Sequence, residues 1–301
     1  MKITSLAKIK GLLNKSHNPL YFHDDDADGL ISYLLLRKGF CKGVGVIIRV
    51  RGLSLNEEEL YLRKINEYNP DLVVFLDKPN LTQEVFDKIN VKKVWIDHHD
   101  VIDVTGVNYY NPRMRNKKNN KPTSYICYQL TKKNLWLATV GSVADWNLVL
   151  FNEFRKKYAD LASNTKPLKK LKADDVLYNT KLGELIRIFS FLLKGKMNEV
   201  GRNIEMLLRI NDPYDILDKK TEEGRKLFES ADRVNRQYLE LMNKSLDETK
   251  KNKGRVLPFI YVSDRISFTS DLANEMIHRN PGRIIVVGRI KDEQIRMSLR
   301  S

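Results

Sequence analysis

The apolar residues of this chain change their spacing twice along its length. Between residues 19 and 146, short β-rich apolar runs alternate with segments of helical spacing, which predicts a parallel sheet with crossover helices. Between 181 and 250 the spacing is near 3.6 and predicts almost continuous helix, ending in a long amphipathic helix that stops at 250–254. After Gly254 the pattern returns to strands around one helix. The sequence therefore predicts α/β architecture: a parallel-sheet domain with flanking helices, a long connecting helix and a small α/β C-terminal domain.

The pattern places the individual elements as follows. Strands are predicted at 20–22, 46–50, 72–76, 94–96, 106–109, 256–262, 284–287 and 294–299. Helices are predicted at 29–39, 56–67, 81–89, 123–132 and 270–278, with a buried helix over 135–150 that is interrupted at Gly141 and Asp145. The 301 residues are enough for two domains. The pattern divides the chain into a parallel-sheet domain at 1–150, a helical region with the connecting helix at 151–254, and a small α/β domain at 255–301.

Charge and composition narrow the class of protein. The formal net charge of +15 creates a positive field that attracts polyanions, so nucleic acid is the leading partner class. General lysine enrichment, as in a thermophile, is the alternative. Cys41 and Cys127 lie far apart, so their spacing suggests neither a zinc ribbon nor a disulfide framework. The sequence has no apolar run of signal-peptide or transmembrane length, so we expect a cytoplasmic protein without membrane contact.

The densest chemical signal is the segment His-Asp-Asp-Asp-Ala-Asp-Gly at 23–29, between a predicted strand and a predicted helix. Its four carboxylates repel one another unless cations neutralise them. An acidic helix N-terminus is the alternative, because aspartates cap free N–H groups there. Capping requires one or two aspartates, and the EF-hand alternative lacks its acidic twelfth residue. The segment therefore favours a metal site.

A second cluster, Asp97-His98-His99-Asp100, follows another predicted strand. Histidine together with aspartate supplies the mixed nitrogen and oxygen ligands that suit manganese, iron or zinc. Three of the five histidines lie in the two acidic clusters. Asp77 follows the strand at 72–76, and Asp145 ends the segment Gly-Ser-Val-Ala-Asp, where small residues permit close helix approach. These two aspartates become candidates as further members of one set.

Taken in order, these four motifs resemble those of the DHH phosphoesterase superfamily. The resemblance implies that 1–150 is the catalytic domain and that 255–301 is a partial substrate-binding domain. The segment at 24–29 is similar to RecJ-type exonucleases, and Asn-Pro-Arg at 111–113 with Pro-Thr-Ser-Tyr at 122–125 is similar to archaeal RecJ-like proteins. The segments at 270–275 and 295–301 resemble the first part of a DHHA1 substrate-binding domain. The Gly-rich loop that follows in that family is missing from this sequence, so we expect a shortened domain or a contribution from another chain.

The resemblance implies two divalent ions, most often Mn²⁺ with Mg²⁺ also possible, and a role for each motif residue. The implied metal ligands are Asp26, Asp28, Asp77, His98 and Asp145, with Asp77 as the bridge. The implied catalytic residues are His99, which faces the phosphate, Asp97, which supports the site, and the additional carboxylate Asp24. We place substrate binding at His23, Arg113, Arg296 and Arg300. The alternative is an ordinary solvated strand face for Arg296 and Arg300, and a surface loop without a specific contact for Arg113. Trp95, Trp136 and Trp146 lie in apolar surroundings, which favours the core over base stacking.

The function implied is hydrolysis of single-stranded DNA or RNA from an end, with replication or repair proteins as further partners. One alternative is a nanoRNase or cyclic-dinucleotide phosphodiesterase, although Phe22 stands where that branch usually has histidine. A second is a non-catalytic scaffold of the replication machinery, against which the complete set of metal-binding motifs argues. A third is an inorganic pyrophosphatase, whose small substrate does not require a broad positive field.

Overall fold

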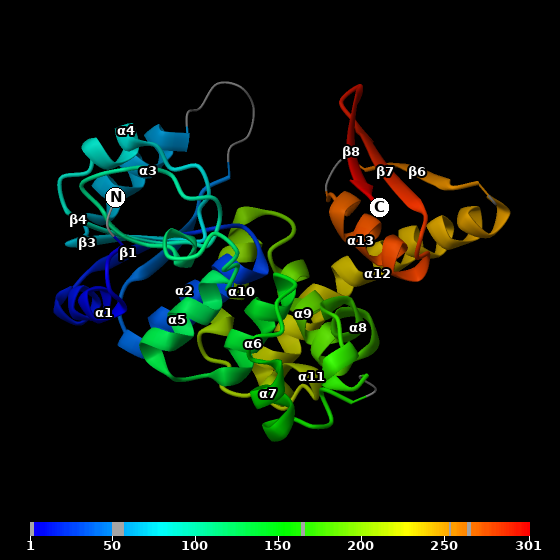
Figure 1. Cartoon of the computed structure of the whole chain (residues 1–301), viewed down its shortest axis with the longest axis horizontal. Helices are drawn as coiled ribbons and strands as arrows, with labels where there is room; N and C mark the ends of the chain where they lie inside the picture. The colour runs from blue at the N-terminus through cyan, green and yellow to red at the C-terminus, as the bar shows by residue number, and fades with distance from the viewer. Residues whose placement is uncertain (1–2, 50–56, 164–165, 253, 264–265) are drawn as a thin grey trace. The chain divides into compact units, whose positions relative to one another are not determined.

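The chain forms two compact units (Figure 1). The computed structural model describes residues 3–49, 57–163, 166–252, 254–263 and 266–301. One unit comprises Met1–Ile186 with Asn211–Pro213, and the other comprises Arg187–Ile210 with Tyr214–Ser301. The three functional segments expected from the sequence stay a prediction, since a compact unit and a functional domain need not coincide.

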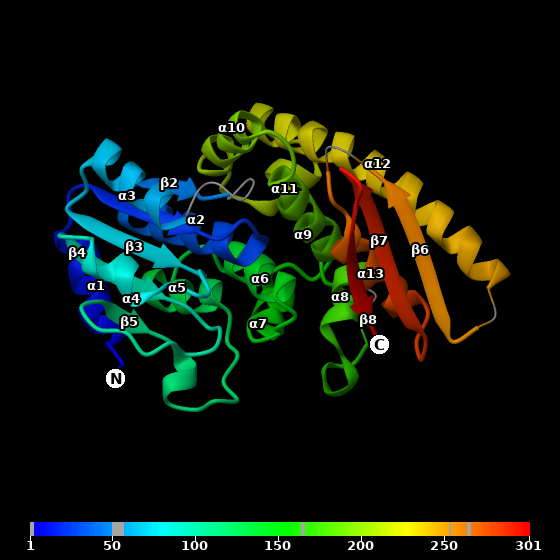
Figure 2. The ribbon, with the colours of Figure 1, turned by 90° about the horizontal axis from the view of Figure 1, so that it is seen from above.

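The first unit is built on a five-stranded parallel sheet of order β2-β1-β3-β4-β5 (Figure 2). Its strands are β1 (Pro19–His23), β2 (Val44–Ile47), β3 (Leu72–Leu76), β4 (Lys92–Ile96) and β5 (Asn108–Tyr110). All five residues of β1 and of β3 are buried, because helices cover both faces of a parallel sheet. This explains why these strands are continuous apolar runs in the sequence.

The helices of the first unit pack on this sheet or on one another. They are α1 (Leu6–Lys15), α2 (Ala27–Phe40), α3 (Glu57–Tyr68), α4 (Gln83–Asp87), α5 (Thr123–Thr131), α6 (Leu135–Ala144), α7 (Phe151–Lys157) and α8 (Ala173–Asn179), with 3₁₀ turns η1 (Pro112–Met114) and η2 (Leu168–Lys170). On one face, Phe22, Phe75 and Trp95 pack with Tyr61 of α3 and Phe86 of α4. On the other, α2 packs against α5 and α6. The parallel-sheet fold class expected from the sequence is thus confirmed.

Several predicted elements have other bounds in the structure. The segment 135–150 is helical only to Ala144, where α6 ends after continuing through Gly141; Trp146 then takes a left-handed φ of 57°, and the next helix begins at Phe151. The strand predicted at 106–109 is β5, Asn108–Tyr110. Helix α4 is five residues long, shorter than the predicted 81–89. Strand β2 begins at Val44 and ends at Ile47; the end of its predicted range, Val50, lies outside the described residues, as does the first position of the predicted helix 56–67.

The second unit contains a long helix and a small mixed sheet. Its helices are α10 (Met197–Leu207), α12 (Glu222–Lys251) and α13 (Thr269–Arg279), while α9 (Lys181–Leu192) and α11 (Pro213–Leu217) each cross the division between the units. The sheet has the order β6-β7-β8, from Val256–Val262, Ile284–Lys291 and Gln294–Arg300, with β6 and β7 parallel and β8 antiparallel. Among the described residues, no helix is both long enough and apolar enough to span a membrane.

Candidate metal centre

The acidic motifs meet at the carboxyl ends of three neighbouring strands. In the sheet register, Leu76 of β3 pairs with His23 of β1 on one side and with Ile96 of β4 on the other. The residues that follow these three strand ends are Asp24, Asp77 and Asp97. Ligand sites of open parallel sheets form at this edge, so the strand order brings together motifs that lie far apart in the sequence.

Asp77 lies at the centre of the cluster, held by backbone and side-chain contacts. Its φ of 58° is in the left-handed region, which aspartate tolerates better than bulkier residues do. Its N–H donates to Ile96 O at 3.0 Å, and Thr123 Oγ1 donates to its Oδ1 at 3.0 Å. The carboxyl is 1% exposed, and burial together with the charges of Asp26 and Asp97 raises its pKa well above the usual range.

Asp26 and Asp28 come from the start of α2. Asp26 is the N-cap residue and accepts a hydrogen bond from Gly29 N at 2.9 Å. Asp28 is buried and accepts hydrogen bonds from Thr123 N at 2.7 Å and Ser124 N at 3.1 Å, at the N-terminus of α5. Burial raises the pKa of Asp26 to about 6 and that of Asp28 well above its usual range. Thr123 and Ser124 were given no role from the sequence, although a Pro-Thr-Ser segment is typical of a helix start.

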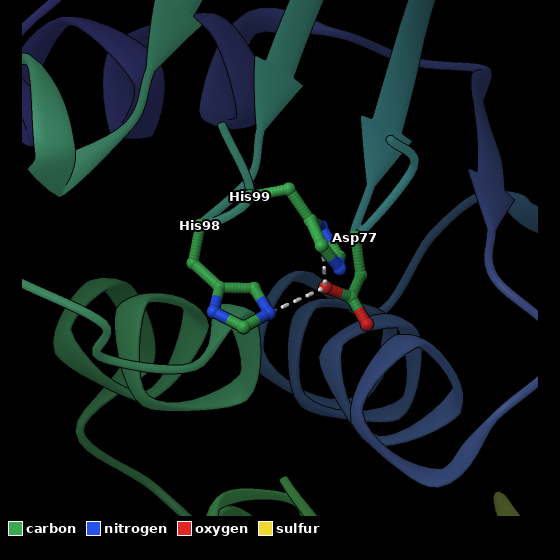
Figure 3. Close-up of side chains that lie close together, drawn as sticks. All are labelled: Asp77, His98 and His99. Atoms are coloured by element: carbon green, nitrogen blue, oxygen red, sulfur yellow. Dashed lines mark ion pairs between the residues drawn. The ribbon is translucent and has the colours of Figure 1, made fainter. Parts of the chain in front are cut away.

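The two histidines of the second cluster point toward Asp77 (Figure 3). His98 Nε2 lies 3.4 Å from Asp77 Oδ1 and 3.6 Å from Asp145 Oδ2. His99 Nδ1 lies 2.8 Å from Asp97 Oδ1 and 3.9 Å from Asp77 Oδ1. The close partner of His99 is therefore Asp97, whereas His98 stands between two carboxylates at distances too long for good hydrogen bonds.

The donor set fits divalent cations. Two groups of ligand atoms each lie within 4.8 Å: Asp77 with His98 and His99, and Asp28 with His98 and Asp145. Burial raises the pKa of Asp145 as well, against the opposing charges of His98 and His99. Buried carboxylates this close destabilise one another unless a cation is shared, and aspartate with imidazole suits manganese. The implied ligands Asp28, Asp77, His98 and Asp145 are thus brought together, with Asp26 coupled electrostatically to the same cluster.

Asp97 and Asp24 lie beside this cluster, and each carboxylate contacts other side chains or backbone groups. Asp97 is fully buried and accepts hydrogen bonds from His99 N at 3.0 Å and from Asn111 Nδ2 at 3.3 Å. Asp24 Oδ1 lies 3.1 Å from Lys78 Nζ, whose side chain is 9% exposed and also contacts Glu57. Asp97 is placed to orient His99, and Lys78, which the sequence did not indicate, neutralises Asp24.

The expected substrate-binding residues lie in different surroundings. His23 is 1% exposed and stacks on Tyr33, and burial lowers its pKa to about 4, so its side chain has no surface for a substrate and is given no such role below. Arg113 bonds to the exposed Asp100 at 2.6 Å and lies near enough to Asp145 to oppose the rise in its pKa. Arg296 and Arg300 belong to the second unit, where Arg300 Nε donates to Asn274 Oδ1 at 2.6 Å.

One tryptophan departs from the sequence expectation. Trp95 and Trp136 are buried as predicted, but Trp146, directly after Asp145, is 47% exposed. The cause is local: α6 ends at Ala144, and the left-handed conformation of Trp146 turns the chain out of the helix. An exposed aromatic ring next to a candidate metal ligand is available for stacking.

Glycine at position 29 is required by the acidic loop. A Cβ atom there would lie 2.7 Å from Asp24 N and 2.8 Å from Asp24 O, and backbone atoms cannot move aside without displacing the loop. We expect Gly29→Ala to lower the free energy of unfolding by about 1–3 kcal/mol, as overpacking does. Gly11→Ala in α1 is the matched control, because nothing lies within 4 Å of its Cβ, and it should stabilise by about 0.5–1 kcal/mol. Urea denaturation of both variants checks this; equal stabilities would contradict it.

The raised carboxyl pKa values predict how pH acts on the metal-free protein. The pKa of an aspartate in an unfolded chain is ~3.9, whereas burial raises the pKa of Asp26 in the fold to about 6. Between these two pKa values the folded protein still binds a proton that the unfolded chain has released, and this proton stabilises the fold. The free energy of unfolding therefore falls as the pH rises toward 6 and the buried carboxyls ionise. We expect a lower Tm at about pH 8 than at about pH 5 in chelator, and a larger rise on adding Mn²⁺ at the higher pH, where fewer protons compete. At 100 times its Kd, Mn²⁺ should stabilise by roughly 2.7 kcal/mol. A Tm that does not change on addition of Mn²⁺ at either pH would exclude the metal centre.

Comparison with solved structures relates this chain to others by fold. RecJ from Thermus thermophilus in complex with Mn²⁺ matches with a TM-score of 0.64 and 16% identity, over 96% of this chain and 46% of that chain. A structure of exonuclease RecJ bound to manganese matches at 0.58 and 16%, over 100% and 83%. The DHH domain of a protein described as a member of a ribosomal-protein family matches at 0.61 and 13%, over 95% and 74%. No family model matches the sequence, and no curated protein matches it either.

The fold and the site together define an α/β protein with an aspartate–histidine cluster of the kind that binds divalent metals. The fold is the DHH fold of RecJ, as the sequence motifs implied. The chain spans 46% of the length of the Thermus protein. Its sequence identity to these structures is 13–16%, so the likeness is one of fold.

Proposed function

We propose that this protein is a metal-dependent phosphodiesterase that shortens single-stranded DNA or RNA from an end. The observation that carries the proposal is the convergence of Asp28, Asp77, His98 and Asp145 in two overlapping groups of ligand atoms that share His98. Manganese is the favoured ion and magnesium the second choice, because the donor set includes imidazole. The net charge of +15 supports a polyanionic substrate.

Each part of the cluster has a distinct task in this proposal. Divalent cations at such a site lower the pKa of water and offset the charge of phosphoryl oxygens. Asp97 holds His99 through Nδ1, which leaves Nε2 of this 41% exposed side chain to face the substrate phosphate. The hydrogen bond to Asp97 raises the pKa of His99, so its ring keeps a proton that it can give to the leaving oxygen. Arg113 adds positive charge beside Asp145. Arg296 and Arg300 remain proposed phosphate contacts of the second unit.

The test uses end-labelled single-stranded DNA and RNA, dinucleotides, cyclic dinucleotides and pyrophosphate, each with Mn²⁺, Mg²⁺ or chelator. We expect Mn²⁺-dependent shortening of the long oligonucleotides from one end, and no reaction in chelator. Preferred cleavage of dinucleotides would favour the nanoRNase alternative. Metal binding without hydrolysis of any substrate would favour a scaffold of a replication or repair complex. Equal hydrolysis in chelator would exclude a metal-dependent mechanism.

Trp146 is proposed as a stacking platform for a base next to the cleaved bond. Stacking of a base on an aromatic ring is worth about 1–3 kcal/mol, so we expect Trp146→Ala to raise the KM for oligonucleotides about 10-fold with kcat nearly unchanged. Trp146→Phe is the matched control and should restore most of the affinity, because it keeps an aromatic face. A fall in kcat without a change in KM would contradict a role in binding.

A further inference from the structure

The small sheet of the second unit exposes one wholly aliphatic face. Side chains alternate between buried and exposed along β6, and the buried ones, Leu257, Phe259 and Tyr261, are on the face that α13 covers. Figure 2 shows β6, β7 and β8 as one sheet. The outer face, here called the aliphatic face, is formed by Val256 at 47% exposure, Ile260 at 51%, Val262 at 71%, Ile295 at 48%, Met297 at 54% and Leu299 at 61%.

The strand register makes this face continuous. Gly288 of the central strand pairs with Ile260 on one side and with Met297 on the other. A Cβ atom at Gly288 would lie 3.3 Å from side-chain atoms of Ile260 and Ile295, so those flanking side chains close over the central strand. The next row, Val262 with Ile290 and Ile295, is also aliphatic. No charged residue interrupts these rows.

The side chains of this face favour a protein partner over nucleic acid. Single-stranded nucleic acid is held by cationic and aromatic side chains, and the six exposed residues include neither. They expose on the order of 600 Å², the upper limit for the largest apolar patch of a monomer. Two such faces packed together would bury on the order of 1,200 Å², which reaches the size of a stable interface.

Charges at the two ends of the sheet favour a second copy of this chain. The β7–β8 turn carries Asp292 and Glu293, both with left-handed φ angles, and Glu293 has no partner among the described residues. At the opposite end, Arg255 before β6 is exposed and likewise has no partner in the described part of the chain. A two-fold axis that lies in the plane of the interface and runs perpendicular to the strands brings the two faces together. It places the acidic turn of one copy over the arginine end of the other. The face is thus complementary to itself in its aliphatic side chains and in the charges at its two ends.

We propose that two copies of this chain pack their aliphatic faces together, with strands antiparallel across the interface and Arg255 of each copy facing Glu293 of the other. The interface is a sheet-on-sheet contact, in which inner side chains from two sheets interdigitate. It is isologous, so every substitution acts twice per dimer.

The oligomeric state of the full chain tests this. Light scattering during size-exclusion chromatography should give twice the monomer mass of 35.1 kDa at micromolar concentration. Met297→Glu should weaken the dimer at least about 100-fold, because two charges would be buried without partners. Val262→Lys, at a strand end, repeats the test where folding is less at risk. Leu239→Lys on α12, 40% exposed and not part of the aliphatic face, is the matched control and should stay dimeric. Circular dichroism checks that each variant is folded.

Charge reversal tests the orientation of the two copies. Arg255→Glu and Glu293→Lys should each weaken the dimer about 10-fold, and the double variant should recover most of the loss, because it restores the pairs in reverse. A wild-type protein that is monomeric at about 100-fold higher concentration would overturn the proposal, as would a dimer broken by Leu239→Lys but not by Met297→Glu. A Met297→Glu variant with weaker oligonucleotide binding and no change in mass would also overturn it, and would assign the face to nucleic acid.

Discussion

Replacing Asp77 by asparagine is expected to abolish metal-dependent hydrolysis, with kcat/KM falling by about 10³-fold or more. Asp77 Oδ1 is the oxygen nearest to His98 Nε2 and also lies close to His99 Nδ1, and its carboxyl belongs to the buried cluster that a cation must neutralise. Asparagine keeps the size and can still accept from Thr123, but it removes the negative charge that binds the cation. The measurement is hydrolysis of an end-labelled oligonucleotide at saturating Mn²⁺.

Measurements of metal binding and of stability distinguish the loss of a metal ligand from misfolding of the variant. The variant should lose the Mn²⁺-dependent rise in Tm while its metal-free form is more stable than the wild type at about pH 8, because one buried charge is gone. Asp103→Asn, an exposed aspartate in the loop after the second cluster, is the matched control and should keep activity within about two-fold. Full activity of Asp77→Asn would exclude the proposed centre.

The second large effect is expected at Asp97, which touches His99 and lies beside the ligand cluster. Asp97→Asn keeps the shape of a fully buried side chain but no longer favours the Nδ1–H tautomer and the protonated ring of His99. We expect kcat to fall by about 10²–10³-fold. KM should change little, because Asp97 does not reach the substrate.

The pH profile shows whether Asp97 acts through His99. In the wild type the hydrogen bond from Asp97 raises the pKa of His99, so the ring keeps its proton to higher pH. In Asp97→Asn that pKa falls, and the alkaline limb of the kcat profile should move to lower pH. In a His99→Ala background, Asp97→Asn should add little further loss, since two residues that act as a unit are not additive. A pH profile that does not move would leave Asp97 a purely structural residue.

The local pattern of the sequence predicted much of this molecule. Continuous apolar runs predicted β1 and β3, because strands buried on both faces tolerate few polar residues. Four aspartates within five residues indicated a cation site, because unpaired carboxylates repel one another at any position in a fold. The motif order also implied the DHH fold, which the structural comparison confirmed. These features depend on residue type and spacing, and the sequence contains both.

The tertiary structure decided how those residues divide their tasks. The neighbouring positions of β1, β3 and β4, which the sequence does not reveal, bring Asp77 and His98 within 3.4 Å. Only the fold showed that Thr123 and Ser124 hold Asp28 and that Lys78 neutralises Asp24, because these contacts join segments 95, 96 and 54 residues apart. Only the fold showed that His23 is buried and that Trp146 is exposed, because both depend on where neighbouring helices begin and end. Spacing along the chain predicts which residues can share chemistry, whereas strand order and burial determine which of them meet.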